Sequence, residues 1–91
     1  MNSSLRVYAV YDRIASTFSE PLVFPSEALA IRHFNYSMEQ NPLVSDDCML
    51  YFLGYYNYDK GIFVSETDPC FVMAYEKRVS PRSTSGQQND E

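Results

Sequence analysis

A nearly unbroken run of strand-forming residues at positions 49–57 most limits the folds open to this chain. Tyrosine, phenylalanine and leucine dominate the run, and such residues favour a pleated, largely buried strand. A turn sequence ending in Gly61 follows, and glycine supplies the left-handed conformation that closes a hairpin, so residues 62–64 are expected to return antiparallel. The sequence therefore predicts a central strand in an antiparallel sheet, with Gly54 marking a β-bulge or a close backbone approach.

Two segments near the amino terminus also carry strand signals. Residues 5–11 alternate in character, which places Arg6 and Tyr8 on one face of a strand and Tyr11 on the other. Residues 18–24 form a weaker extended segment, because Pro21 removes a backbone donor and restricts it to a sheet edge or an irregular strand. We therefore expect one regular strand and one edge strand in this part of the chain.

A single helix is predicted over residues 27–39. Ser26 is the expected N-cap, and Glu27 lies where the positive end of the helix dipole favours an acid. Pro42 ends the segment, because the residue before a proline is disfavoured in the helical conformation. Apolar residues recur at helical spacing and define the face expected to pack on the sheet: Ala30, Ile31, Phe34 and Met38.

The last part of the chain continues the sheet and then loses its pattern. Asp68 followed by Pro69 predicts a further turn, and residues 70–75 a last strand. Residues 80–91 are polar and aperiodic, as disordered segments are. The expected organisation is one domain over residues 1–79 and a disordered tail over residues 80–91. The expected fold class is α+β, with one helix packed on an antiparallel sheet of four or five strands.

One helix can cover only one face of such a sheet. The other face or an edge would stay open, and in a chain of 91 residues with a small core this favours a homodimer. The same uncovered face would present aromatic rings of the 51–58 segment. Alternation along a regular strand would put Tyr51 and Tyr55 on one face, with Phe52 and Tyr56 on the other.

Composition excludes several classes of protein. No apolar run approaches the roughly 18 residues of a membrane helix, so no membrane association is expected. Cys48 and Cys70 are the only cysteines and His33 is the only histidine, too few for a closed zinc site. A Cys48–Cys70 disulfide is the alternative, but both cysteines are expected to be buried, reduced thiols. No nucleophile, phosphate-loop or metalloprotease motif occurs, so we expect neither an enzyme nor a cofactor.

The net charge is -5 and it is concentrated in the middle of the chain. Residues 37–75 hold Lys60 against six acids, including Asp46 and Asp47 in a predicted loop and Asp59 in a turn, where solvated carboxylates are ordinary. A uniformly phosphate-binding surface is therefore excluded.

Several short segments, in order, resemble one known family. They are residues 20–24, residues 28–34 with the core Ala30-Ile31-Arg32-His33-Phe34, and residues 50–61, which contain Leu53-Gly54-Tyr55-Tyr56 and the turn at Gly61. Together they are similar to the small nonstructural protein of gokushoviruses, tailless single-stranded DNA phages of the microvirus group. A His-Pro pair often precedes the acidic loop in that family, whereas Asn41-Pro42 stands here.

The resemblance implies a DNA-binding accessory protein that acts in genome replication or packaging, in the host cytoplasm, and it brings no catalytic residues. Single-stranded DNA binding requires aromatic faces for bases and a few cations for the backbone. The side chains that could supply them are Arg6, Tyr8, Arg13, Arg32, Tyr51, Tyr55, Tyr56, Lys77 and Arg78.

Each of these residues also has a structural interpretation. Aromatic strand residues commonly form core or dimer contacts, and scattered arginines commonly pair with carboxylates. Arg32 could equally pair with an acid and fix the helix on the sheet. The competing hypothesis is therefore a protein–protein interaction module that does not touch DNA, whose acidic surface contacts a capsid or replication protein.

Overall fold

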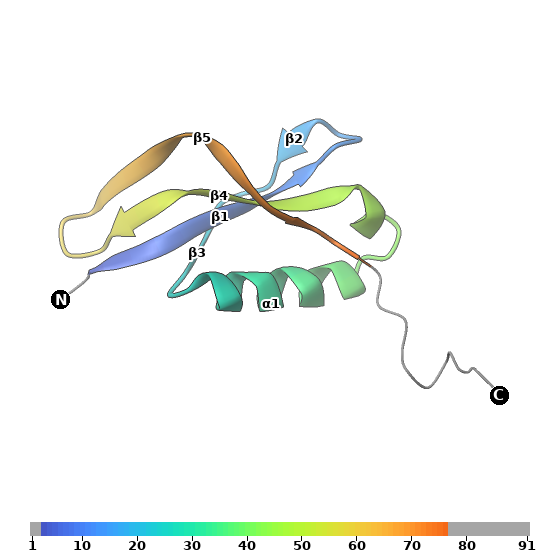
Figure 1. The fold of residues 1–91 in the computed structure, drawn as a ribbon, viewed down its shortest axis with the longest axis horizontal. Coiled ribbons are helices and arrows are strands. Elements are labelled where there is room, and N and C mark those ends of the chain that lie inside the picture. Colours follow the sequence, from blue (N-terminus) through green and yellow to red (C-terminus); the bar gives the residue numbers. More distant parts are fainter. Residues whose placement is uncertain (1–2, 77–91) are drawn as a thin grey trace.

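The computed structural model describes residues 3–76 and has one helix on one side of a five-stranded antiparallel sheet (Figure 1). The strands are β1 (Ser4–Asp12), β2 (Thr17–Phe18), β3 (Leu22–Phe24), β4 (Cys48–Asn57) and β5 (Ile62–Ala74). The helix is α1 (Glu27–Glu39), and a short 3-10 helix, η1 (Ser45–Asp47), leads into β4. The predicted α+β class is confirmed. The tail expected over residues 80–91 lies outside the described residues.

The sheet is centred on β1 and β4, which pair along most of their length. The strand order is β2-β1-β4-β5, and β3 also pairs with β1. The run at positions 49–57 therefore forms the central strand that its composition predicted. The edge position predicted for residues 18–24 is also confirmed, although Pro21 falls between two short strands instead of within one.

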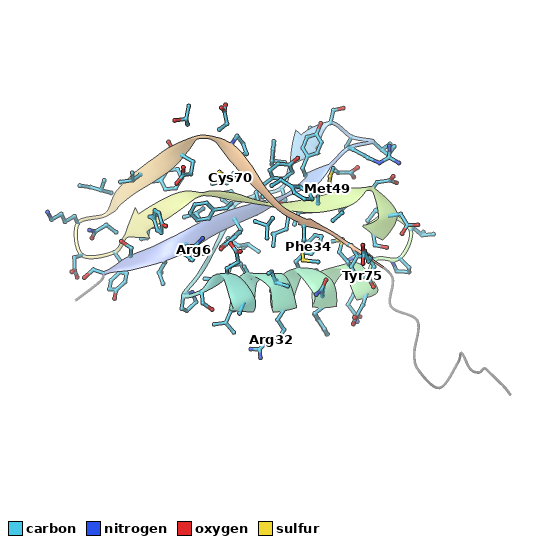
Figure 2. The ribbon with its side chains drawn as sticks, in the orientation of Figure 1. Arg6, Arg32, Phe34, Met49, Cys70 and Tyr75 are labelled. Carbon is cyan, nitrogen blue, oxygen red and sulfur yellow. The ribbon has the colours of Figure 1, made fainter. Side chains whose placement is uncertain are left out.

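Helix α1 covers one face of the sheet and its bounds match the prediction. Its N-cap is Ser26, whose Oγ accepts a hydrogen bond from the backbone N–H of Leu29 at 3.3 Å. Ala30, Phe34 and Met38 are buried on the helix side, and they pack against four buried residues of the sheet: Tyr8, Cys48, Leu50 and Phe52. Phe34 is labelled between helix and sheet in Figure 2.

Gly54 interrupts the regular pairing of β4, as its sequence context predicted. Its φ is 150°, and a Cβ at this position would collide with the carbonyl oxygen of Val64 and lie 2.8 Å from the Cα atom of Ser65. The irregularity interrupts the regular alternation of β4 side chains between the two faces of the sheet. The prediction that Tyr51 and Tyr55 share a sheet face is wrong, because the Tyr55 ring lies 5.3 Å from Phe52 on the opposite side from Tyr51.

β5 is a single strand, whereas the sequence indicated two strands separated by a turn at Pro69. Phe52 pairs with Cys70 and Gly54 pairs with Ser65, so residues 66–69 lie opposite Leu53 alone. The Asp68-Pro69 signal therefore produces a bulge within an edge strand and not a reversal of the chain. An edge strand tolerates proline because a missing donor can face away from the ladder.

Candidate functional site

Four aromatic rings from four different strands meet on the sheet face that α1 does not cover. They form the open-face cluster, defined as Tyr11 of β1, Phe18 of β2, Tyr51 of β4 and Phe71 of β5. Ring centroids lie 4.8 Å apart for Tyr11 and Phe18, 5.4 Å for Phe18 and Tyr51, and 5.8 Å for Tyr51 and Phe71. The face is assigned from β1 and β4, where Tyr8 and Leu50 point to the helix and their neighbours point away.

The open-face cluster presents ring surface to solvent. Phe18 is 44% exposed and Phe71 is 58% exposed, while Tyr11 and Tyr51 are half-buried between them. Met49 lies on the same side of the sheet in Figure 2. Neighbouring rings meet at steep angles, between 52° and 78°. Such a cluster combines fixed inner rings with outer rings whose faces can accept a flat partner.

A second group of side chains, the Arg6 cluster, lies on the helix side of the sheet, at the amino-terminal end of α1. It is defined as Arg6, Tyr8, Glu27, Phe52 and Tyr55. The Arg6 Nε donates to the Tyr8 hydroxyl at 2.7 Å, and that hydroxyl donates to Glu27 Oε1 at 2.8 Å. A second Arg6 nitrogen forms a 3.3 Å ion pair with the same Glu27 oxygen.

Aromatic rings complete the surroundings of Arg6. The guanidinium carbon lies 4.3 Å from the centre of the Phe52 ring and 5.5 Å from that of Tyr55, and a guanidinium nitrogen donates to the Tyr55 hydroxyl at 3.3 Å. These distances fall within the range of cation–π attraction. The cluster holds the start of α1 against β1 and β4.

The electrostatics of the Arg6 cluster follow from this geometry. The hydrogen bond to Tyr8 raises the pKa of Arg6 despite partial burial, so the guanidinium stays charged. Burial raises the pKa of Tyr8, and the hydrogen bond that Arg6 donates only partly opposes this, so the hydroxyl stays neutral and can donate to Glu27. Glu27 balances the charge of Arg6, and Tyr8 is only 1% exposed. Neither the Arg6 charge nor the Tyr8 ring is freely presented to a ligand.

The other predicted cations are spread over the molecule. Arg13 follows β1 and forms a 2.9 Å ion pair with Asp47, although its side chain is 60% exposed. Arg32 points away from the sheet on the outer side of α1, so the alternative of fixing the helix to the sheet is wrong (Figure 2). Lys77 and Arg78 lie outside the described residues. Of these cations, Arg13 is the closest along the chain to the open-face cluster.

The predicted aromatic residues divide between the two sides. Tyr51 belongs to the open-face cluster and Tyr55 to the Arg6 cluster. Tyr56 is half-buried and pairs with Leu5 and Phe63 towards the hairpin end of the sheet. Sequence reasoning missed Tyr11, Phe18 and Phe71 as members of one site. The alternation of residues 5–11 placed Tyr11 opposite Tyr8, but no local signal brings three further strands beside it.

A cavity of about 520 Å³ opens between α1 and the sheet on the side of β2 and β3. Its walls are mainly apolar and include Tyr8, Leu22, Phe24, Phe34 and Leu50. Its size is typical of small-molecule pockets, but most of these residues are also the hydrophobic core. Polar groups at its lining include His33, whose ring lies 5.3 Å from that of Phe24 and whose Nε2 lies 3.5 Å from the Ser37 hydroxyl.

Among residues 3–76, no three His, Cys, Asp or Glu side chains gather in a way that could hold a metal ion. Cys48 is buried in the core and both cysteines are free thiols, but Cys70 is exposed, so the expectation that it is buried is wrong because it lies on the edge strand β5. Burial, aided by the nearby Asp12 and Asp47 charges, raises the pKa of the Cys48 thiol. In the part of the chain that the structure describes, no helix is long and apolar enough to cross a membrane.

Fold and site together define a small α+β protein whose sheet has one helix-covered face and one open, aromatic face. Comparison with protein families then places the chain. The model of a family described as Phage ORF5 protein matches residues 5–78, and the chain belongs to that family. This matches the phage origin that the resemblance implied. No curated protein and no solved structure matched the chain.

Proposed function

We propose that this phage protein binds single-stranded DNA through the open-face cluster and acts in genome replication or packaging in the host cytoplasm. The observation that carries the proposal is the contact of Tyr11, Phe18, Tyr51 and Phe71 on an uncovered sheet face. Aromatic rings on an open sheet are a common platform for unpaired bases, and stacking does not require a particular base.

Stacking rather than phosphate attraction supplies most of the affinity in this proposal. Arg6 and Arg13 are each paired with a carboxylate, and Arg32 lies on the far side of the molecule. Few phosphate contacts are therefore available within residues 3–76. Each phosphate contact with a single strand contributes about -0.7 to the slope of log K against log salt. Binding should therefore weaken as salt rises, with a small slope of log K against log salt.

The test is a fluorescence-anisotropy titration of a labelled oligo-dT with purified protein at low and moderate salt, with a duplex of equal length as the comparison. We expect micromolar binding that prefers the single strand. Phe71→Ala and Phe18→Ala should each raise Kd by roughly 5- to 150-fold, because one stacked base contributes about 1–3 kcal/mol. The matched control is Tyr36→Ala, which removes an exposed ring from α1 on the other side of the molecule.

Two results would contradict the proposal. The first is no binding to the single strand even at low salt. The second is binding that Tyr36→Ala weakens as much as Phe71→Ala does, since that would place the DNA elsewhere. A circular dichroism spectrum of each variant shows whether the fold has survived, so that loss of binding is not confused with loss of structure.

The second candidate function is a protein–protein interaction module without DNA binding. The acidic residues of the 37–75 segment and the exposed apolar residues of β5 favour it. Its partner would be a phage capsid or replication protein. It predicts that neither the wild type nor the Phe71→Ala variant binds nucleic acid. It also predicts that charge reversal at Glu66 or Asp68 weakens capture of the protein partner.

A further inference from the structure

The outer edge of β5 is the least protected part of the sheet. Within residues 3–76, β5 pairs with β4 alone, so one side of this 13-residue strand has a free row of backbone donors and acceptors. The first ten of its residues, 62–71, are all exposed. The opposite edge is different, because two short strands of two and three residues close it. A long free edge is a template for pairing with another chain.

The two halves of this edge are not equivalent. Residues 66–69 bulge and contain Glu66, Asp68 and Pro69, and charges, bulges and proline all discourage pairing. The half that precedes them has no charge and no proline. It presents Ile62, Phe63 and Val64, which are 49%, 51% and 59% exposed. We therefore take residues 62–65, directly after the hairpin turn, as the available segment.

We propose that this segment is a dimer interface, at which β5 pairs antiparallel with β5 of a second copy around a two-fold axis at Phe63. In this register Phe63 faces Phe63 of the other copy, and Ile62 faces Val64. In an isologous contact of this kind, the same segment of each copy pairs with that of the other. The two-fold symmetry limits the assembly to two copies.

Charge complementarity selects this register and this occupant. A two-fold axis at Phe63 brings Lys60 of each copy, in the hairpin turn before β5, to the same end of the ladder as Glu66 of the other copy, which begins the bulge after Ser65. Neither residue forms an ion pair within the described residues. An axis in the second half of β5 would instead bring the bulge with Glu66, Asp68 and Pro69 into the ladder, where charges and proline discourage pairing. The segment therefore has an apolar centre and opposite charges at its two ends, so two copies of it complement each other when they pair antiparallel.

The test is the oligomeric state of the full chain, measured by sedimentation velocity over a range of micromolar concentrations. The wild-type protein should dimerise. Phe63→Asp places two carboxylates against each other at the centre and should raise the dimer Kd at least about 100-fold. Leu43→Asp is the control, because Leu43 is 96% exposed in a loop away from this edge. It should leave the dimer unchanged.

A charge-reversal series keeps the proposal testable if Phe63→Asp does not fold, since Lys60 and Glu66 are exposed. Lys60→Glu and Glu66→Lys should each raise the dimer Kd about tenfold, and the double variant should restore it. A monomeric wild-type protein would overturn the proposal. So would a dimer that Phe63→Asp or Lys60→Glu leaves intact, or one that Leu43→Asp disrupts equally. None of these outcomes depends on DNA binding.

Discussion

Adding one methyl group at Gly54 should remove a large part of the stability of the protein. Gly54 has φ 150°, in the region where L-residues are strained, and the added Cβ would meet the backbone of Val64 and Ser65. These atoms belong to the neighbouring strand and cannot rotate away as a side chain could. The Gly54→Ala variant must either separate β4 from β5 locally or distort β4.

The magnitude follows from two contributions. A residue held in a glycine-only conformation costs about 1–3 kcal/mol, and overpacking a rigid site costs about 1–3 kcal/mol more. The expected loss is therefore about 2–6 kcal/mol, against a total free energy of unfolding of roughly 5–14 kcal/mol for a chain of this length. Gly61→Ala is the matched control. Gly61 also has positive φ, at 67°, but a Cβ there meets no atom within 4 Å, so the loss should be only the cost of the left-handed conformation, about 1–2 kcal/mol.

The assay is urea unfolding followed by far-ultraviolet circular dichroism and tyrosine fluorescence for the wild type and both variants. The midpoint should fall much further for Gly54→Ala than for Gly61→Ala. Equal losses for the two variants would refute the reasoning, because backbone conformation alone would then account for both. A wild-type-like midpoint for Gly54→Ala would show that β4 and β5 do not approach each other as closely as described.

Two further predictions concern titratable groups. Cys70 should react quickly with a thiol reagent in the native protein, whereas Cys48, buried and with a raised pKa, should react only on unfolding; equal native rates would contradict its burial. Because burial raises the pKa of Tyr8, the free energy of unfolding should hold below the ordinary tyrosine pKa of about 10 and fall as pH rises above it. Urea titrations on both sides of that pH should show a smaller fall for Tyr8→Phe, and an equal fall would assign the effect to other residues.

Local signals fixed the helix and the central strand. Ser26 caps α1 through its own hydroxyl, and Pro42 prevents the helix from continuing a few residues beyond Glu39. Both ends of the helix are therefore determined by residues close to them in the sequence. The 49–57 run formed the central strand because its aromatic and aliphatic side chains can be buried on one face and half-buried on the other.

Non-local pairing decided the parts that sequence reasoning placed incorrectly. Gly54 was recognised as a bulge, but the shift it causes in the side-chain phase depends on how β1 and β5 pair around it, so Tyr55 was assigned to the wrong face. Pro69 is a turn signal in isolation. In the structure Pro69 belongs to a bulge, because β4 pairs with the residues of β5 on both sides of residues 66–69.

The candidate site shows the same division. Alternation correctly placed Arg6 beside Tyr8, and the 2.7 Å hydrogen bond between them is the result. Glu27, which balances the Arg6 charge, comes from the start of α1, and only the packing of α1 on the sheet brings it within reach. The open-face cluster likewise joins residues from four strands, so its membership depends on the sheet order.

The proposed dimer and the proposed DNA site are geometrically compatible. A two-fold axis that relates antiparallel β5 strands in one continuous sheet runs perpendicular to that sheet, so it keeps equivalent faces on the same side. Both copies of α1 would then lie on one side, and both open-face clusters on the other. Phe71, at the β5 end of each cluster, would be the member closest to the other copy along the shared sheet. A single-stranded DNA long enough to reach both open-face clusters should bind with one DNA molecule per dimer, and its affinity should fall in the Phe63→Asp variant. A shorter oligonucleotide that covers only one cluster should bind the Phe63→Asp variant and the wild type equally well.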